Sequence, residues 1–375
     1  MKLALRELRR QPGRFVTATV ILTLIASLLM LLGGLLDGLL SGATSAVLAQ
    51  EGELIVFSST AEDSFLRSRI TTETSAQVAA VEGVSAVGGI GVVQLGARVP
   101  GKGERDLLDV VLFGYELPPA GVPDPPAAGR AYADATLEAQ GLEKGMTIEL
   151  GQARTPVEII GFVDDLQFSG QGTLWVDAAT WREALNANRP GSGVGDDTFQ
   201  SLVVQVDDNA APAAVASSID STTGSSTDGR TSTLTVVDAA NAIGGVEQQR
   251  STFNQIIGVT VIIAIVVVAL FFALLTVERT AMYGVLKAVG ARSRTLFGGV
   301  LLQAVIVTII ASCIGGALAL ALDLAAPPGS IPFTLTPARV VTSVVLLLLS
   351  ALIGCAFSLR RVLRIDPASA IGSGT

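Results

Sequence analysis

Residues Phe15 to Leu36 read FVTATVILTLIASLLMLLGGLL and include no charged side chain. A helix needs about 20 apolar residues to cross the hydrocarbon core of a bilayer, so this run predicts a membrane span. Three later runs meet the same requirement, at Ile256–Val277, Leu296–Leu320 and Val340–Phe357. The sequence therefore predicts an α-helical integral membrane protein with four transmembrane helices.

The first span has an alternative interpretation as a cleaved signal peptide, because basic residues from Lys2 to Arg14 precede it. The apolar core of a signal peptide is about 7–15 residues long, which is shorter than this run. Small residues from Ser45 to Ala49 would nevertheless suit a cleavage site. We expect an uncleaved span and keep cleavage as the alternative.

The composition agrees with a membrane protein that carries a polar domain. The 375 residues are 50% hydrophobic and 15% charged, whereas soluble domains are about 25% charged. Histidine is absent, and both cysteines, Cys313 and Cys355, lie inside apolar runs. The chain therefore lacks the commonest general base and offers no disulfide framework to its polar part.

Lys and Arg residues concentrate in three segments, which lie before the first span, between the second and third spans, and after the fourth. Because such segments mark the cytoplasmic side, we expect a multi-pass protein of the cell membrane with both termini in the cytoplasm. The expected parts are a cytoplasmic amphipathic helix at 1–14, spans at 15–44, 251–277, 296–322 and 337–358, an extracytoplasmic domain at 45–250, a cytoplasmic loop at 278–295, an extracytoplasmic loop at 323–336 and a cytoplasmic tail at 359–375.

The long segment between spans one and two mixes β-rich runs, such as Leu107–Phe113, with helical pieces, such as Ala133–Gln140 and Ala239–Gln249. This mixture predicts an α+β domain inserted between the first two transmembrane helices. Residues 51–250 hold 12 basic and 28 acidic side chains, a net charge of −16. Such a charge argues against nucleic acid as a partner.

No catalytic constellation stands out in the sequence. The pair Asp164–Asp165 follows a predicted strand, where a solvated turn is favoured over a calcium site or acid–base chemistry. No Walker A sequence is present, so any ATP that drives the protein must bind another chain. We therefore expect a chain that is not an enzyme by itself and that holds no permanently bound cofactor or metal.

The loop after the second span reads ERTAMYGVLKAVGAR from Glu278 to Arg292. Val285, Leu286 and Val289 recur at helical spacing, and Gly290 suits a helix end. The segment predicts a short amphipathic helix at the membrane surface. Such a helix either offers an apolar ridge to a cytoplasmic partner or lies at the membrane without one.

This loop resembles that of the FtsX-like, or MacB-type, permeases of ABC transporters, in which Glu-Arg is followed by a Leu-Lys-Ala-Val-Gly-Ala block. The Asp366–Ile371 tail matches the same family. The resemblance implies a permease homodimer in membrane lipid, bound to two cytoplasmic ABC ATPase subunits that hold ATP and Mg²⁺. It also implies that the loop helix couples ATP hydrolysis to the membrane. The residues with that implied role are Glu278, Arg279, Met282, Leu286, Lys287, Val289, Gly290 and Ala291.

A finer likeness is to the heme-export (Hrt-type) permeases of Gram-positive bacteria, and it rests on Gly34–Ala43 and on Phe65–Arg69. It implies that heme, or a similar amphipathic toxic compound, is extruded from the membrane. Without histidine, the iron would need ligands such as methionine or carboxylate, and Met30 or Glu51 would supply them. The predicted substrate-binding residues are Met30, Gly33, Gly34, Asp37, Glu51, Glu53, Arg67 and Arg69.

Each of these residues also has a simpler interpretation. Met30 would serve packing, and the charged residues would form a solvated rim. Asp37 is the most informative, because a carboxylate near the end of a span either faces a cavity or reaches the interface. The alternative functions are an FtsX-like signalling permease that controls a cell-wall hydrolase, or an exporter of lipids, lipoproteins or antibiotics.

Overall fold

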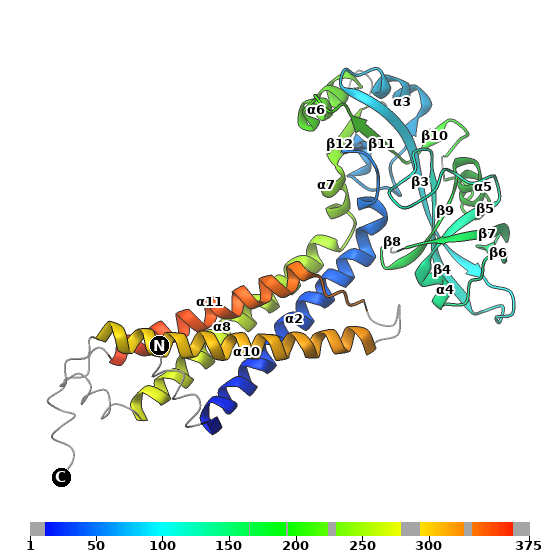
Figure 1. The fold of residues 1–375 in the computed structure, drawn as a ribbon. Coiled ribbons are helices and arrows are strands. Elements are labelled where there is room, and N and C mark those ends of the chain that lie inside the picture. Colours follow the sequence, from blue (N-terminus) through cyan, green and yellow to red (C-terminus); the bar gives the residue numbers. More distant parts are fainter. Residues whose placement is uncertain are drawn as a thin grey trace, which may run out of the picture. The chain divides into compact units, whose positions relative to one another are not determined.

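The computed structural model describes residues 12–164, 166–192, 194–223, 230–278, 293–325 and 332–362 (Figure 1). It contains two compact units. The helical unit comprises Met1–Gly38 and Arg250–Thr375, and the sheet unit comprises Leu39–Gln249.

The helical unit is built from four long helices (Figure 1). They are α2 (Pro12–Leu48), α8 (Val246–Glu278), α10 (Ser293–Ala325) and α11 (Pro337–Val362). Each contains a stretch long and apolar enough to cross a membrane, as judged by length and composition. With the sheet unit inserted between α2 and α8, this arrangement confirms the predicted fold class of four transmembrane helices and an α+β domain.

The four helices share one apolar core. Each contributes a stripe at helical spacing, as α2 does with Ala18, Leu22, Ala26 and Leu29. The other members of this core cluster are Ala264, Val268, Phe272, Val300, Ala304, Val307, Ala311, Leu347, Ala351 and Cys355. Small residues recur among them, as is usual where membrane helices approach closely.

The sheet unit contains the following strands. They are β1 (Leu54–Ser58), β2 (Ile70–Thr71), β3 (Val84–Arg98), β4 (Leu107–Tyr115), β5 (Arg130–Asp134), β6 (Thr147–Leu150), β7 (Thr155–Val163), β8 (Gln167–Phe168), β9 (Gln171–Asp177), β10 (Thr198–Phe199), β11 (Ser201–Val206) and β12 (Thr231–Thr235). Its shorter helices are η1 (Ser59–Ala61), α3 (Thr72–Ala79), α4 (Ala135–Ala139), α5 (Ala178–Asn188), α6 (Pro212–Thr222) and α7 (Val236–Asn241).

The main sheet has the strand order β12-β1-β11-β3-β4-β9-β5-β7-β6, and β8 pairs with β9. Its longest strand, β3, pairs with β11 and β4 and, at Ala97 and Arg98, also with β6. The sheet therefore bends back on itself at that end. The pairs β4–β9 and β5–β7 are parallel, and the other pairs of this sheet are antiparallel.

Both faces of the sheet are covered. Along β1, Leu54 and Val56 join the core cluster that includes α3, α5 and α6, whereas Ile55 and Phe57 join the cluster that includes α7 and the last turn of α2. Successive side chains of a strand point to opposite faces, so an uninterrupted apolar strand such as β1 is buried on both sides. The sheet unit is therefore a layered α+β domain.

Two predicted helices in the sheet unit need correction. The segment predicted as helix Ala133–Gln140 begins as strand β5, and helix α4 follows only after Asp134, whose carboxylate caps it by accepting the N–H of Thr136 at 2.9 Å. The predicted helix Ala239–Gln249 is two helices, α7 and α8. Gly245 separates them with a φ of +89°, a backbone conformation that favours glycine.

Candidate functional site

The predicted substrate-binding residues fall into two groups. Met30, Gly33, Gly34 and Asp37 lie on α2 in the helical unit. Glu51, Glu53, Arg67 and Arg69 lie in the sheet unit.

Met30 is almost fully buried, with 1% of its surface exposed. It packs against α10, where a Cβ atom built on Gly316 would lie 3.5 Å from the Met30 sulfur. The thioether therefore fills a gap that a glycine leaves open between α2 and α10. In this conformation its sulfur is covered by the chain itself.

Residues 332–339, which we call the strap, lie on one face of α2. A Cβ atom on Gly33 would overlap the Arg339 side chain, and one on Gly34 would overlap the Phe333 ring. The backbone N–H of Thr334 donates a hydrogen bond to the Gly34 carbonyl oxygen at 3.1 Å. Glycine at these positions permits this close approach, since any side chain would displace the strap.

The fourth α2 residue of the group, Asp37, is bound by the strap. Its carboxylate accepts two charge-assisted hydrogen bonds from Arg339, from Nε at 2.9 Å and from Nη2. The hydroxyl of Thr336 lies 3.4 Å from the same carboxylate. Both charged side chains are 21% exposed. A paired, half-buried carboxylate at this depth is far less unfavourable than an isolated one in lipid.

The sheet-unit residues are held differently. Glu51 is exposed, and its backbone carbonyl accepts a hydrogen bond from Gln205. The Glu53 carboxylate accepts the N–H of Val206 at 2.8 Å, which ties it to the end of β11. Arg67 forms a 2.8 Å ion pair with Glu62 that is open to solvent. Glu51 and Arg67 are therefore available to a ligand at the surface.

Arg69 is engaged by the chain's own backbone. Its guanidinium donates to the carbonyl oxygens of Leu66, Ser68 and Ser192, at distances from 2.6 to 3.1 Å. Partial burial lowers the pKa of this guanidinium below its usual value. Four donated hydrogen bonds make Arg69 a structural anchor in this conformation, which sequence reasoning had not indicated.

The predicted ATPase-coupling residues lie at the edge of the described structure. Glu278 is the last residue of α8. The other seven, from Arg279 to Ala291, lie outside the described residues. Their assignment to a coupling helix stays a prediction.

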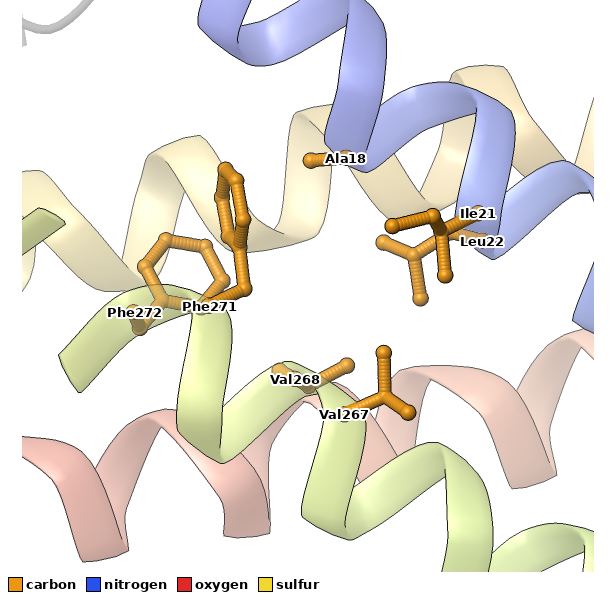
Figure 2. A pocket seen from close by; sticks show the side chains of 7 residues that line it. All are labelled: Ala18, Ile21, Leu22, Val267, Val268, Phe271 and Phe272. Carbon is orange, nitrogen blue, oxygen red and sulfur yellow. The ribbon is translucent and has the colours of Figure 1, made fainter. Parts of the chain in front are cut away.

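A small apolar pocket lies between α2 and α8. Figure 2 shows its lining side chains on the two helices. They are Ala18, Ile21, Leu22, Val267, Val268, Phe271 and Phe272. Its volume is about 10 Å³, room for at most one water molecule. This pocket is too small for an organic ligand.

Sequence reasoning missed the role of the strap. Neither Arg339 nor Phe333 was among the predicted substrate-binding residues. The available signal was an unpaired acid at the outer end of span one and an unpaired base at the outer end of span four. Opposite charges at such depths favour pairing. Among the described residues, no three His, Cys, Asp or Glu side chains gather as a metal site.

The four apolar helices and the inserted domain define a multi-pass membrane protein. Residues 254–367 match the family model described as "FtsX-like permease C-terminal". This match covers three of the four long helices, α8, α10 and α11. It confirms the resemblance to FtsX-like permeases drawn from the sequence.

Several known proteins are similar to parts of this chain. "Putative hemin transport system permease protein HrtB" of Staphylococcus haemolyticus is 30% identical over 130 residues, which are 35% of this chain and 37% of that protein. An uncharacterized ABC transporter permease of Mycobacterium tuberculosis is 36% identical over 112 residues, 30% of this chain and 31% of that protein. The chain thus spans less than half the length of these relatives.

Among solved structures, the periplasmic region of MacB from Actinobacillus actinomycetemcomitans aligns with a TM-score of 0.38 and 12% identity. That alignment covers 52% of this chain and 94% of the MacB region.

Proposed function

We propose that this chain is the permease subunit of an ABC-type exporter that extrudes hemin, or a similar amphipathic toxic compound, from the membrane. The observation that carries the proposal is the similarity to relatives named as permeases of hemin transport systems. The match to the FtsX-like permease C-terminal family supports the permease part independently of the substrate.

The energy source is a separate cytoplasmic ATPase. The chain has no Walker A sequence, so ATP and Mg²⁺ bind the partner. Two copies of the permease join two ATPase subunits, and the loop 278–295 contacts the ATPase. Basic segments are typical of the cytoplasmic side of a membrane, which supports a cytoplasmic position for this loop and both termini and an extracytoplasmic position for the sheet unit.

Few side chains of this chain are suited to bind the iron and the carboxylates of hemin. Hemin is the transported substrate and needs an iron ligand other than histidine, which the chain lacks. Of the two proposed ligands, Met30 is covered by α10 and Glu51 has an exposed carboxylate. Glu51 is therefore the better ligand in this conformation, and the exposed Arg67 is placed to pair with a carboxylate of the substrate.

The test uses full-length protein, purified with its ATPase and reconstituted in lipid. We expect the Soret band of hemin to shift on binding. In Glu51→Gln the affinity for hemin measured from this shift should fall about tenfold, or 1.4 kcal/mol. Glu104→Gln, another exposed carboxylate of the sheet unit, is the matched control. ATP-dependent release of hemin from the proteoliposomes then measures export.

The outcomes separate the candidate functions. Absence of both hemin binding and hemin export would exclude this substrate, while ATP-dependent release of a lipid, lipoprotein or antibiotic would identify another exporter. Dependence of a cell-wall hydrolase on the chain, with nothing transported, would identify the signalling alternative.

A further inference from the structure

The outer part of α2 in the helical unit is held in an unusual way. Leu29 is the last α2 residue in the apolar core that the four helices share. Beyond it, Gly33, Gly34 and Gly38 form a face without side chains, and the strap covers that face. A Cβ atom on Gly38 would lie 2.7 Å from the backbone nitrogen of Phe333 and would also overlap the Pro332 carbonyl. The strap replaces interdigitated apolar packing here.

Besides the close approach of the Arg339 side chain to Gly33 and of the Pro332 carbonyl to Gly38, two kinds of contact join the strap to α2. One is polar: the Asp37–Arg339 ion pair, with Thr336 nearby, and the hydrogen bond from the Thr334 N–H to Gly34. The other is the Phe333 ring, which rests on Gly34. Because a glycine face has no side chains to interlock, such a segment can separate from it without repacking a core.

The position of the ion pair also permits separation. Asp37 directly follows the uncharged run Phe15–Leu36, and Arg339 lies at the start of the apolar segment Pro337–Phe357. Each side chain is 21% exposed. Long charged side chains at a span end reach the interface, where water solvates them once they are apart. The same pair at the centre of the bilayer would have no such solvent.

We propose that the strap is a releasable clasp on α2, closed in this structure, whose opening uncovers Gly33, Gly34 and Asp37 and frees Arg339 for a ligand. The ligand chemistry follows from what the clasp occupies. A carboxylate would replace Asp37 on the Arg339 guanidinium, and a flat apolar surface would replace the Phe333 ring on Gly34. The ligand is thus an amphipathic carboxylate with an aromatic face, and this part of the proposal rests on the proposed function.

The first arm of the test measures clasp opening without transport. The full chain carries Cys313→Ser and Cys355→Ala, and a single thiol is introduced as Phe333→Cys. Its rate of reaction with a bulky, membrane-impermeant maleimide is measured with and without Arg339→Gln. We expect the rate to rise about tenfold when Arg339 is replaced, because the ion pair no longer holds the strap.

The matched control for this arm is Thr334→Cys. Thr334 is an exposed residue of the same strap, so its thiol should react quickly whether or not Arg339 is present. Equal rates for the Phe333→Cys thiol in the two proteins would overturn the clasp.

The second arm locks the clasp. Thr334→Cys and Leu35→Cys, which flank the hydrogen bond from the Thr334 N–H to the Gly34 carbonyl oxygen, are joined by a reducible bifunctional thiol reagent, and hemin export is compared before and after reduction of the same protein. We expect export to fall at least about tenfold while the bridge is intact and to recover on reduction. Ala338→Cys with Thr342→Cys, both exposed on α11, carries the same bridge within one helix and should leave export unchanged.

The two arms separate the two proposals. Normal hemin export by the bridged protein would overturn clasp opening and leave the transport proposal intact. Failure of the wild-type protein to export hemin would overturn the proposed substrate. In that case, or where the reduced double variant is itself inactive, the labelling comparison alone decides whether the clasp exists.

Discussion

Tyr115 shows how burial sets the behaviour of one residue in the sheet unit. Its side chain is 1% exposed, its phenol donates a hydrogen bond to the Pro123 carbonyl oxygen at 2.7 Å, and its ring meets Trp175 edge-on. Burial raises the pKa of this phenol well above its ordinary value, and the nearby Tyr132 and Asp124 raise it further. The phenol therefore stays protonated and able to donate.

The pH dependence of stability follows from that shift. Because the pKa of Tyr115 is higher in the folded protein than in the unfolded chain, where it is about 10, its stabilising contribution is fully present below about pH 10 and is lost as the pH rises further. We expect Tyr115→Phe to lower the free energy of unfolding by about 1 kcal/mol at pH 8 and to make its decline above pH 10 less steep.

Both tryptophans, Trp175 and Trp181, lie in the sheet unit, so their emission during chemical denaturation reports this free energy. Val122→Ala, a truncation in the same core cluster that removes no ionisable group, is the control and should retain the steep decline. A parallel decline in wild type and Tyr115→Phe would contradict the assignment.

Asp37 is the residue at which sequence reasoning came closest to the site. Its place near the end of a span predicted a cavity or contact with the interface, and the structure shows an ion pair instead. The partner itself, Arg339, lies 302 positions away in the sequence. A single sequence contains no signal for that pairing beyond the two opposite charges, since side-chain geometry decides which of the span-end charges meet.

At the scale of elements, the four spans could be predicted because length and apolar composition suffice for them. Their buried faces could not. A helix surrounded by lipid is apolar on every side, so periodicity does not mark the face that packs against protein. Exposed Leu24 and buried Leu22 on α2 are chemically alike. The pairing of strands could not be predicted from the sequence either, because β3 pairs with β11, which follows about a hundred residues later.

Two glycines of the helical unit mark faces at which its helices pack against one another. On α10, a Cβ atom at Gly315 would lie 2.9 Å from the Ala26 Cβ and 3.0 Å from the Ser27 nitrogen of α2. Gly354 of α11 stands similarly close to Ile265 and Ala269 of α8. These two positions set the separation between the helix pairs.

We expect Gly315→Leu to push α10 away from α2 and to lower the stability of the helical unit by about 1–3 kcal/mol, the usual range for overpacking. Thermal unfolding in detergent, followed by size-exclusion chromatography, measures the loss. Gly298→Leu is the matched control on the same helix, because no atom lies within 4 Å of a Cβ at Gly298. Equal melting temperatures for the two variants would show that α2 and α10 do not pack through Gly315.

At the scale of the whole molecule, the chain consists of two compact units. The helical unit contains the segment that matches the FtsX-like permease family. Its helix α8 ends at Glu278, where the predicted coupling loop begins. The sheet unit is a layered domain with a fully buried core on each face of its sheet. The sequence contains no Walker A motif, and the proposed function assigns ATP hydrolysis to a partner chain.

The predicted site of energy input is the coupling loop at residues 278–295, in which Leu286 and Gly290 lie outside the described residues. If residues 278–295 dock on the ATPase, Leu286→Glu would disrupt the apolar ridge and Gly290→Val the helix stop. Either change should leave ATP hydrolysis intact but reduce substrate export about tenfold or more, in line with coupling energies of 1–3 kcal/mol. Both rates are measured in the same proteoliposomes. Thr342→Ala, an exposed position on α11, should change neither rate. Normal export by both loop variants would place the energy input elsewhere, whereas loss of hydrolysis together with export would mean that the loop is needed to assemble or activate the ATPase.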